Sequence, residues 1–550
     1  MSLLADFSAP VQRVYESCVD TLLVNLAQHF NRIAGGNTGT FDHEVELLSK
    51  MGAIHRESAA IIARHFGGGK LDGMIRLAVE TAMLNALKTV EPTLRAAAKR
   101  GLLQGASVSV DESVLRQLTA YSRQAVQQMN LVNTVMLDGC IQAWRKGVYT
   151  LSNAVRQLDA AQLVLNTETG KVITGTSTLQ EAVRSAVRRM HAEGLTGFVD
   201  RGGHRWSPEA YARMDIKTTC SNAARQAVFD RNRDYGNDLV WVRTNATARP
   251  KCYPWQGKVI SMDGQAGTTT DLNGLSVRVY AVQETSYGEP DGLWGISCHH
   301  GPPNVFIPGA SVVRGAQSMP DVEANAKSYA ERQKQRDLER DVRYAKREAA
   351  MLDAAGDKEG FEQAALKVKR KQEALNAFTK STGRAKHGDR TQVLGYNKSV
   401  AGKANAALAL REKRVAWDRD FDDKHRAKTL DELLPSYKRA ENIREKLSAY
   451  TLNQEHSRGK HKAIVFESAL GYNKDIAQEL AAQIQNGLKK YRAVPTGNNG
   501  FGESYRVTML INGAGSKSDV RQPVETGWII RNGEKFPRMV NAIVSKGKRP

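Results

Sequence analysis

Apolar residues recur at helical spacing through the first 160 residues of the chain. Four of them fall on one helical face, namely Leu22, Leu26, Phe30 and Ile33. Alanine-rich stretches over residues 76–100 and 112–158 continue the helical character. Histidines are scattered here, and none forms a catalytic arrangement. The pattern predicts a helical domain over residues 1–160.

At about residue 160, alternation begins to replace helical spacing. Residues 163–175 alternate as in a short hairpin. Three further β-rich segments, separated by glycine and polar turns, cover residues 238–244, 258–264 and 277–283. Residues 161–312 are therefore predicted to form a mixed α/β domain.

Residues 313–430 return to helical spacing and carry many charges. Apolar positions recur at steps of three and four on both sides of Gly356, with Leu338, Val342, Ala345, Ala349 and Leu352 before it and Phe361, Ala365, Val368 and Leu375 after it. Two amphipathic helices joined by a short turn would bury these stripes against each other, which gives a helical hairpin arm with a basic outside. The basic stretch 381–407 has few large apolar residues and is expected to run extended along another surface.

The last 120 residues predict a small α+β domain over residues 431–550. One amphipathic helix carries Ile476, Leu480, Ile484 and Leu488, and alternating strand positions follow at Tyr505, Val507, Met509 and Ile511. The segments TGWIIR and MVNAIV predict two more strands, so a helix is expected on an antiparallel sheet. The fold class is multidomain α+β, with a helical N-terminal domain, a central mixed α/β domain, a helical arm and this C-terminal domain.

Charge adds the first indication of a partner. The formal net charge is +21, and residues 321–550 contribute +16 of it, with 46 Lys and Arg against 30 Asp and Glu. Such a field favours a polyanion, most simply nucleic acid. The alternative is a well-solvated helical surface, since charge runs commonly serve solubility.

Length, apolar runs and cysteine content exclude several classes of protein. A chain of 550 residues is long enough for two to four domains, so it needs no disulfide or metal to fold. No apolar run approaches the roughly 20 residues of a membrane-spanning helix, and the start MSLLADFSAP lacks the pattern of a secretory signal. Five scattered cysteines indicate reduced thiols and a cytoplasmic origin.

Residues 194–309 contain a series of short sequence motifs that resembles a known family. In order, they are Gly194 to Asp200, Gly203 to Trp206, Tyr211 to Met214, Asn222 to Arg225, Ala248 to Cys252, Pro254 to Lys258 and Cys298 to His300. Taken in order, these motifs resemble those of the phage minor capsid protein 2 family, which is related to the head-morphogenesis proteins of Mu-like phages. The likeness extends into the arm, from Gln333 to Arg347 and from Gly395 to Ser399.

The resemblance implies a low-copy structural protein of a tailed-phage head. Its expected partners are portal and capsid proteins and packaged DNA, and its expected location is the head interior, after assembly in the host cytoplasm. Two positions depart from the family's pattern. Lys217 stands where an arginine is expected before a threonine pair. Arg243 to Asn245 stand where a serine and a histidine often precede the Ala-Arg-Pro motif of the family.

Four residues of the central domain are candidate metal ligands, namely Cys252, Cys298, His299 and His300. Thiolates and imidazoles are the ligands that tetrahedral zinc takes. However, no C-x-x-C pair is present, and neighbours in a regular strand point to opposite faces. We therefore expect the motifs that contain Cys252 and Cys298 to pack together in one core without a metal. No cofactor is expected elsewhere.

The C-terminal domain carries a second resemblance. Its words include Glu455-His456, Gly459 to Lys462, Leu470-Gly471, Thr526 to Arg531 and Pro537-Arg538. Over residues 436–545 they resemble toxin-like ribonuclease domains of the barnase, EndoU and colicin type.

Metal-free RNA cleavage needs a base, an acid and cations that hold the phosphate. His461 or His456 could transfer protons, and Thr526 could donate a hydrogen bond. The candidate cations for phosphate are Lys460, Lys462, Arg531 and Arg538. The alternative is an inactive basic docking domain with solvated histidines.

Three interpretations of function stay open. The leading one is a structural and interaction protein of the phage head, and whether the chain is also an enzyme stays open. The second is a virion-delivered effector whose C-terminal domain is a metal-independent ribonuclease, with host RNA as its substrate. The third is a host DNA-binding protein, although the sequence lacks a helix-turn-helix or zinc-finger pattern.

Overall fold

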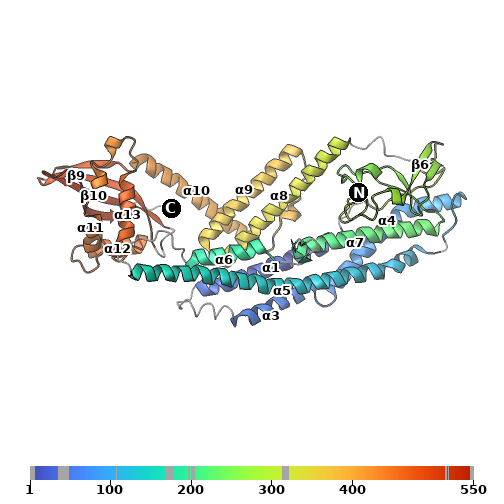
Figure 1. Cartoon of the computed structure of the whole chain (residues 1–550), viewed down its shortest axis with the longest axis horizontal. Helices are drawn as coiled ribbons and strands as arrows, with labels where there is room; N and C mark the ends of the chain where they lie inside the picture. Colours follow the sequence, from blue (N-terminus) through green and yellow to red (C-terminus); the bar gives the residue numbers. More distant parts are fainter. Residues whose placement is uncertain are drawn as a thin grey trace. The chain divides into compact units, whose positions relative to one another are not determined.

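The protein is described by a computed structural model that divides into two compact units (Figure 1). It describes residues 7–34, 49–106, 108–167, 179–195, 198–199, 203, 205–312, 321–498, 500–514, 517 and 520–545. The first unit comprises Met1–Ser152 and Val183–Val400, and the second comprises Asn153–Ala182 and Ala401–Pro550. The fold is multidomain α+β, as the sequence predicts.

Long helices dominate the first part of the chain. They are α1 (Ala9–Ala34), α3 (Met51–Phe66), α4 (Lys70–Lys99) and α5 (Val110–Thr167). Leu22, Leu26 and Phe30 are fully buried, which confirms the predicted apolar face of α1. The side chain of Ile33 lies outside the described residues.

The predicted hairpin over residues 163–175 is wrong at its start. Residues 163–167 are the last residues of α5, because apolar side chains in a short run fit a helix as well as a strand. Residues 168–175 lie outside the described residues. The next helices are α6 (Leu179–Glu193) and α7 (Pro208–Asp234). Helix α7 begins with Ser207, whose Oγ accepts a hydrogen bond from Ala210 N at 3.3 Å.

The central sheet has five short strands in the order β5-β6-β4-β3-β7. Their bounds are Leu239–Trp241 for β3, Val259–Ser261 for β4, Gly267–Thr270 for β5, Ser276–Ala281 for β6 and Asn304–Val305 for β7. Only the β4–β6 pair is parallel. Strands β3, β4 and β6 confirm the three predicted segments. A two-stranded ribbon, β1 (Phe198–Val199) and β2 (Arg205–Trp206), precedes α7.

The predicted helical hairpin is formed by α8 (Val322–Ala354) and α9 (Lys358–Thr382). Its stripes are buried, as predicted, at Val342, Ala345, Ala365 and Val368 among others. Asp357 caps α9 by accepting a hydrogen bond from Gly360 N at 2.9 Å. Helix α8 also packs against α1, so the hairpin contributes to the core of the first unit.

The stretch 381–407 is extended only in part. It contains the short helix η3 (Gly388–Thr391), and α10 (Lys398–His425) begins within it. The prediction is wrong from residue 398 onward, because the alanine-rich sequence after Val400 strongly favours a helix. Asn397 starts that helix by accepting a hydrogen bond from Val400 N at 3.1 Å.

The second unit contains a four-stranded antiparallel sheet in the order β11-β10-β9-β8. The strands are β8 (Ala493–Asn498), β9 (Gly502–Asn512), β10 (Arg521–Arg531) and β11 (Arg538–Val544). The helices are α11 (Ile443–Lys446), which continues as a π-turn at Leu447–Thr451, α12 (Lys460–Leu470) and α13 (Ala477–Leu488).

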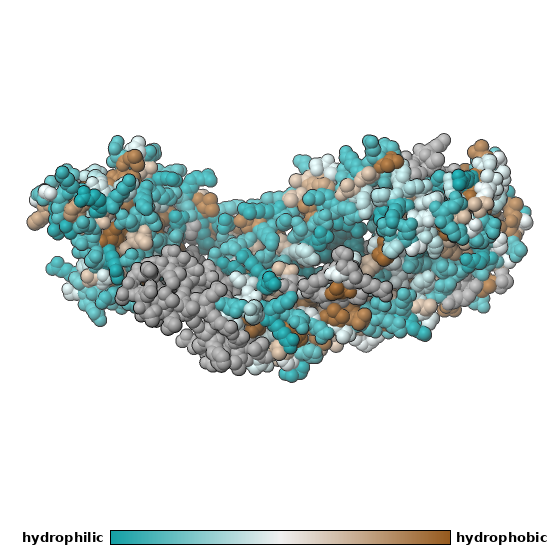
Figure 2. Space-filling view, in the orientation of Figure 1, coloured by the Kyte–Doolittle hydropathy of each residue, from teal (hydrophilic) through white to brown (hydrophobic). Residues whose placement is uncertain are grey.

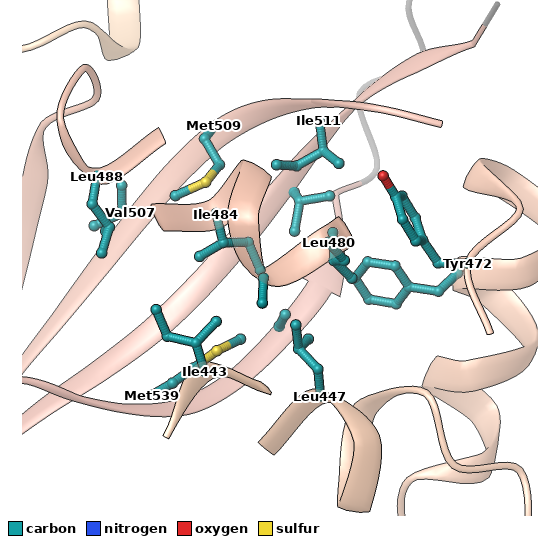
Figure 3. Packing of buried hydrophobic residues seen from close by; sticks show 14 of the residues in the cluster. Ile443, Leu447, Tyr472, Leu480, Ile484, Leu488, Val507, Met509, Ile511 and Met539 are labelled. Atoms are coloured by element: carbon teal, nitrogen blue, oxygen red, sulfur yellow. The ribbon is translucent and has the colours of Figure 1, made fainter. Parts of the chain in front are cut away.

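The core of this sheet is shown in Figure 3. Leu480, Ile484 and Leu488 of α13 lie against residues of the sheet such as Val507, Met509 and Ile511. The predicted helix and the three predicted strands are confirmed. Strand β8 is missed by the sequence pattern, because five of its six side chains are exposed and it contains a proline and a glycine.

Hydrophilic residues cover most of the described surface on the face shown in Figure 2, with apolar residues in small scattered groups. Within the described part of the chain, no helix has the length and apolarity to span a membrane. The stabilising apolar surface is thus mainly inside the two units.

Candidate functional site

Two cysteines and a histidine meet in the core of the central sheet domain. Cys252 precedes the short helix Tyr253–Trp255, and Cys298 and His300 lie in the loop before β7. The two Sγ atoms are 3.9 Å apart, and Cys298 Sγ lies 3.3 Å from His300 Nδ1. All three side chains are buried, and their ligand atoms lie within 4.8 Å of one another. The group could hold a metal ion that accepts thiolate and imidazole ligands.

The environments of the two thiols are unequal. The hydrogen bond with Cys252, together with His300, lowers the pKa of the Cys298 thiol, although burial opposes this. The same hydrogen bond, together with burial, raises the pKa of Cys252. The environment therefore favours the thiolate form at Cys298 more than at Cys252.

The neighbouring histidine, His299, faces another environment. Lys217 Nζ lies 3.3 Å from both of its ring nitrogens, and Asn245 Nδ2 donates to its backbone oxygen at 3.0 Å. Burial, followed by the charges of Lys217 and nearby arginines, lowers the pKa of His299 to about 2. The structure therefore brings three of the four candidate ligands together and turns the fourth away.

Beside this group lies a cavity of about 510 Å³. Its wall combines residues of α4, α7 and α8 with the segment before α1, the loops at residues 243–245 and 298–302, and the short helix η3. The lining residues with a cationic side chain are Arg213, Lys217, Arg243, Arg336 and Arg390, and His299 and His300 also line the cavity. None of the residues that line it in the described chain is an aspartate or glutamate. The cavity is therefore strongly cationic.

Burial and mutual repulsion act on these arginines. Arg336 lies one helical turn after Arg332 on α8, and burial followed by the charges of Arg213, Arg332 and Arg390 lowers its pKa to about 10, against the opposing effect of Glu339. Burial also lowers the pKa of Arg243. Glu339 forms an ion pair with Arg390 at 3.3 Å. The positive charge of this wall exceeds the negative charge next to it.

In the second unit, two of the predicted site residues meet at an aromatic ring. Lys462, in the first turn of α12, lies 4.9 Å from the centre of the Tyr450 ring. His456 makes an edge contact with the same ring at 4.9 Å, and Lys446 lies over it at 4.8 Å. His456 Nδ1 also accepts from Gly459 N at 3.1 Å, just before α12. The result is a small cationic patch around Tyr450.

The other predicted residues of this unit have different surroundings. His461 and Lys460 are exposed in the first turn of α12, and Arg531 is exposed at the end of β10. Thr526 is fully buried, where its hydroxyl donates to Val507 O and accepts from Trp528 Nε1 at 2.9 Å.

Arg538 lies on β11 at the edge of the sheet. It pairs with Glu534 at 2.9 Å and lies over the ring of Phe536. Its guanidinium therefore has a carboxylate partner within the domain. The proposed catalytic roles of these residues stay predictions.

The sequence pattern did not predict the cationic cavity. Arg213 and Lys217, like Arg332 and Arg336, are four residues apart and so lie on one helical face. Basic pairs at this spacing occur on many exposed helices, so they do not by themselves indicate a cavity. A more specific signal was available, because Lys217 and Arg243 both fall at departures from the family's pattern, and both line the cavity.

Comparison with known proteins gives the class of this protein. The model of the family described as phage minor capsid protein 2 matches residues 2–380, well over half of the chain. The protein is thus a structural protein of a bacteriophage virion. It belongs to the phage minor capsid protein 2 family.

Further matches agree with this class. The chain is 26% identical over 289 residues to a protein named "Structural protein" of Lactococcus phage LL-H. The aligned region covers 50% of this chain and 74% of the relative. A second family model, described as a domain of unknown function (DUF6883), matches residues 433–546. No solved structure gives a significant match.

Proposed function

We propose that the protein is a minor structural component of a tailed-phage head, located inside the capsid beside the portal, where it contacts packaged DNA. The observation that carries this proposal is the family match over residues 2–380, which covers most of the first unit. A structural role also agrees with long helices that bury their faces against one another rather than around a catalytic arrangement.

The proposed contact with DNA is supported by charge. Residues 321–550 carry a net +16 of the chain's +21. Part of this charge is exposed on and just after α10, at Lys413, Arg419, Arg426 and Lys428. Cations on a surface replace the counterions of DNA phosphates, so binding would be independent of sequence and weaken as salt rises.

The test of location uses phage particles. Heads and tails are separated after gentle disruption, and the protein is followed by mass spectrometry and by cross-linking to the portal and to DNA. The proposal expects the protein in the head fraction, protected from protease in intact particles, with cross-links to portal subunits. Recovery with the tails, or digestion by protease added to intact particles, contradicts it.

The DNA contact has its own test. Binding of the full-length protein to a random-sequence duplex is measured at several salt concentrations, for the wild type and for a variant with Lys413, Arg419, Arg426 and Lys428 changed to glutamine. The magnitude of the slope of log K against log salt should fall by up to about 0.9 for each DNA phosphate that the variant no longer neutralises. A wild-type slope near zero, or an unchanged slope in the variant, removes DNA contact through this surface.

A second candidate function is a virion-delivered ribonuclease in the second unit. The observation that favours it is the patch around Tyr450, where an aromatic ring, two lysines and His456 lie together at the surface. Lysines attract phosphates, so the patch has the charge of an RNA-binding surface.

This candidate is tested with labelled RNA and DNA, with and without a chelator. The full-length wild type is compared with His461→Ala, His456→Ala and the exposed control Lys474→Ala. Chelator-resistant RNA cleavage that is lost in a histidine variant and retained in the control supports a ribonuclease. Absence of cleavage by a folded wild type leaves a docking surface.

A further inference from the structure

The cationic cavity of the first unit contains buried donors that the described chain does not satisfy. The Nε atoms of Arg243, Arg332 and Arg336 are all buried without a hydrogen-bond partner among the described residues. Arg332 donates through Nη1 to Thr247 Oγ1 at 2.6 Å, which fixes its guanidinium beside the cavity. Glu339 is already engaged by Gln335 and Arg390. Arg243 and Arg336 in the wall, and Arg332 one helical turn before Arg336, therefore have donors that no carboxylate of the wall accepts.

Such an arrangement is unfavourable without a ligand. Like charges repel more strongly where water is excluded, and a buried donor without an acceptor loses its hydration with nothing in return. An anion with several oxygen atoms would relieve both costs at once. Guanidinium groups match phosphate oxygens in particular, because their planar N–H donors bind two oxygens together.

The size and remaining wall of the cavity narrow the ligand further. A volume of about 510 Å³ lies within the range typical of small-molecule sites. The wall also contains small or apolar residues, namely Ala82, Ala86, Ala224 and Pro302, beside the amide of Asn85. These surfaces suit a base and sugar, while the basic residues suit phosphates.

We propose that this cavity binds a nucleotide through its phosphates, with Arg213, Arg243 and Arg336 as the principal phosphate ligands. This goes beyond a structural role in the head and does not depend on contact with packaged DNA. The site lies entirely within the first unit, so the C-terminal domain contributes none of its residues.

The test uses the full-length protein at constant ionic strength. Melting temperature and calorimetric binding are measured with ATP, pyrophosphate and adenosine at millimolar concentrations. ATP and pyrophosphate should raise the melting temperature and adenosine should not, because the phosphates supply the charge. The relative effect of ATP and pyrophosphate shows whether the nucleoside part contributes.

Matched variants connect binding to the cavity. Arg336→Gln and Arg243→Gln should each weaken ATP binding by about tenfold or more. Without ligand, neither should lower the melting temperature, because each removes a charge that lacks a partner. Arg340→Gln, on the exposed side of α8, should bind as the wild type does.

Three results would overturn the proposal. One is the absence of any effect of ATP and pyrophosphate on the wild type. Another is an equal effect of adenosine. The third is undiminished ATP binding in both cavity variants. If one of the two variants fails to fold, the other one decides this point.

The geometry points to a second site, carried by a different observation: Cys252, Cys298 and His300 bind a zinc-class metal ion. Tetrahedral zinc with bonds of about 2.3 Å to sulfur and about 2.0 Å to nitrogen separates two sulfurs by about 3.8 Å and a sulfur from a nitrogen by about 3.5 Å. The observed separations are 3.9 Å and 3.3 Å. Two thiolates also neutralise a divalent ion, so it adds no charge to the cationic cavity.

The coordination is incomplete with three protein ligands. Cys298 and His300 line the cavity, whereas Cys252 does not. A fourth ligand, a water molecule or a ligand oxygen, would enter from the cavity. This arrangement resembles zinc sites that keep one position open.

Metal content of the full-length protein tests this site. Protein purified without chelator should contain about one zinc per chain, and cobalt substitution should give the visible spectrum of a tetrahedral thiolate site. Cys298→Ser and His300→Ala should lose both signals. Cys220→Ser, a buried cysteine of the same cavity outside the group, should keep them. Wild-type protein that binds no zinc or cobalt when reduced, or that contains a Cys252–Cys298 disulfide, overturns the proposal.

Discussion

Arg347 on α8 and Asp20 on α1 form a buried ion pair, with 2.7 Å between Nε and Oδ1. The same guanidinium donates to Glu209 Oε1 of α7 at 3.1 Å, so one arginine joins three helices. Asp20 Oδ2 also accepts from Leu394 N at 2.9 Å. The buried position of Arg347 between these helices explains why the hairpin of α8 and α9 is part of the core of the first unit.

Replacing Arg347 by methionine should destabilise the first unit by about 3–5 kcal/mol, because Asp20 and Glu209 would stay buried without their cation. Urea unfolding measures the change. Arg340→Met on the same helix is the control, since the exposed Arg340–Asp337 pair should contribute within about 0.5 kcal/mol. Equal effects of the two substitutions would show that the triad does not stabilise the fold.

Stability should also depend on Glu91 in acid. Burial raises the pKa of this carboxyl, but hydrogen bonds from Arg231, Arg95 and Tyr235 outweigh burial and lower it to about 2 from 4.5. Since the folded pKa lies below the unfolded one, the stabilisation is present above pH 4.5 and is lost as the pH falls towards 2.

Glu91→Gln should therefore cost about 3 kcal/mol at neutral pH and progressively less below pH 4.5. Unfolding free energies measured from neutral pH down to pH 3 provide the comparison. Glu373→Gln, on the exposed side of α9, serves as the control. A difference between wild type and Glu91→Gln that is independent of pH would contradict the assignment.

Two helical glycines should respond oppositely to alanine. A Cβ at Gly147 of α5 would lie 2.9 Å from Phe30 Cζ and 3.0 Å from Met190 Sδ, whereas one at Gly73 of α4 would meet nothing within 4 Å. Gly147→Ala should destabilise by about 1–3 kcal/mol through overpacking. Gly73→Ala should stabilise by up to about 1 kcal/mol through helix propensity. Thermal melts of both variants give the signs.

The hydroxyl of Thr526 should matter for stability of the second unit. Thr526→Val leaves the buried Trp528 Nε1 without its acceptor and should cost about 1–3 kcal/mol. Thr526→Ser keeps the hydroxyl and should cost less, in proportion to one lost methyl group. Urea midpoints of the two variants distinguish the hydrogen bond from packing, and a valine variant as stable as wild type would show that the bond contributes nothing.

Much of the fold could be predicted because its signals are local. The apolar stripe of α13 and the alternation of β9 each repeat often enough to define an element. Strand β8 could not be found in this way, because exposed residues and a proline carry no period. The start of α10 was hidden because the glycine and basic residues near Lys398 outweighed the alanines that follow.

The candidate sites were harder to predict, since they depend on contacts between distant segments. Adjacent His299 and His300 were expected to interfere with each other as ligands. In the loop they face different partners, Lys217 and Cys298. Thr526 was predicted as a site residue from its sequence context, and it is buried by its place in the sheet. The motif around a residue does not show which face of its strand is covered by other parts of the fold.

The pairing of Asp20 with Arg347 also bears on how the chain matures during synthesis. These residues are separated by 327 positions, which a ribosome adding about 5–20 residues per second covers in about 16–65 s. Helix α1 is made at the start of that time, α7 is complete after residue 234, and α8, which carries Arg347, is complete only after residue 354. Asp20 on the N-terminal helix therefore lacks its buried cation until α8 has been made, and the first unit can complete its core only after residue 394 has left the ribosome.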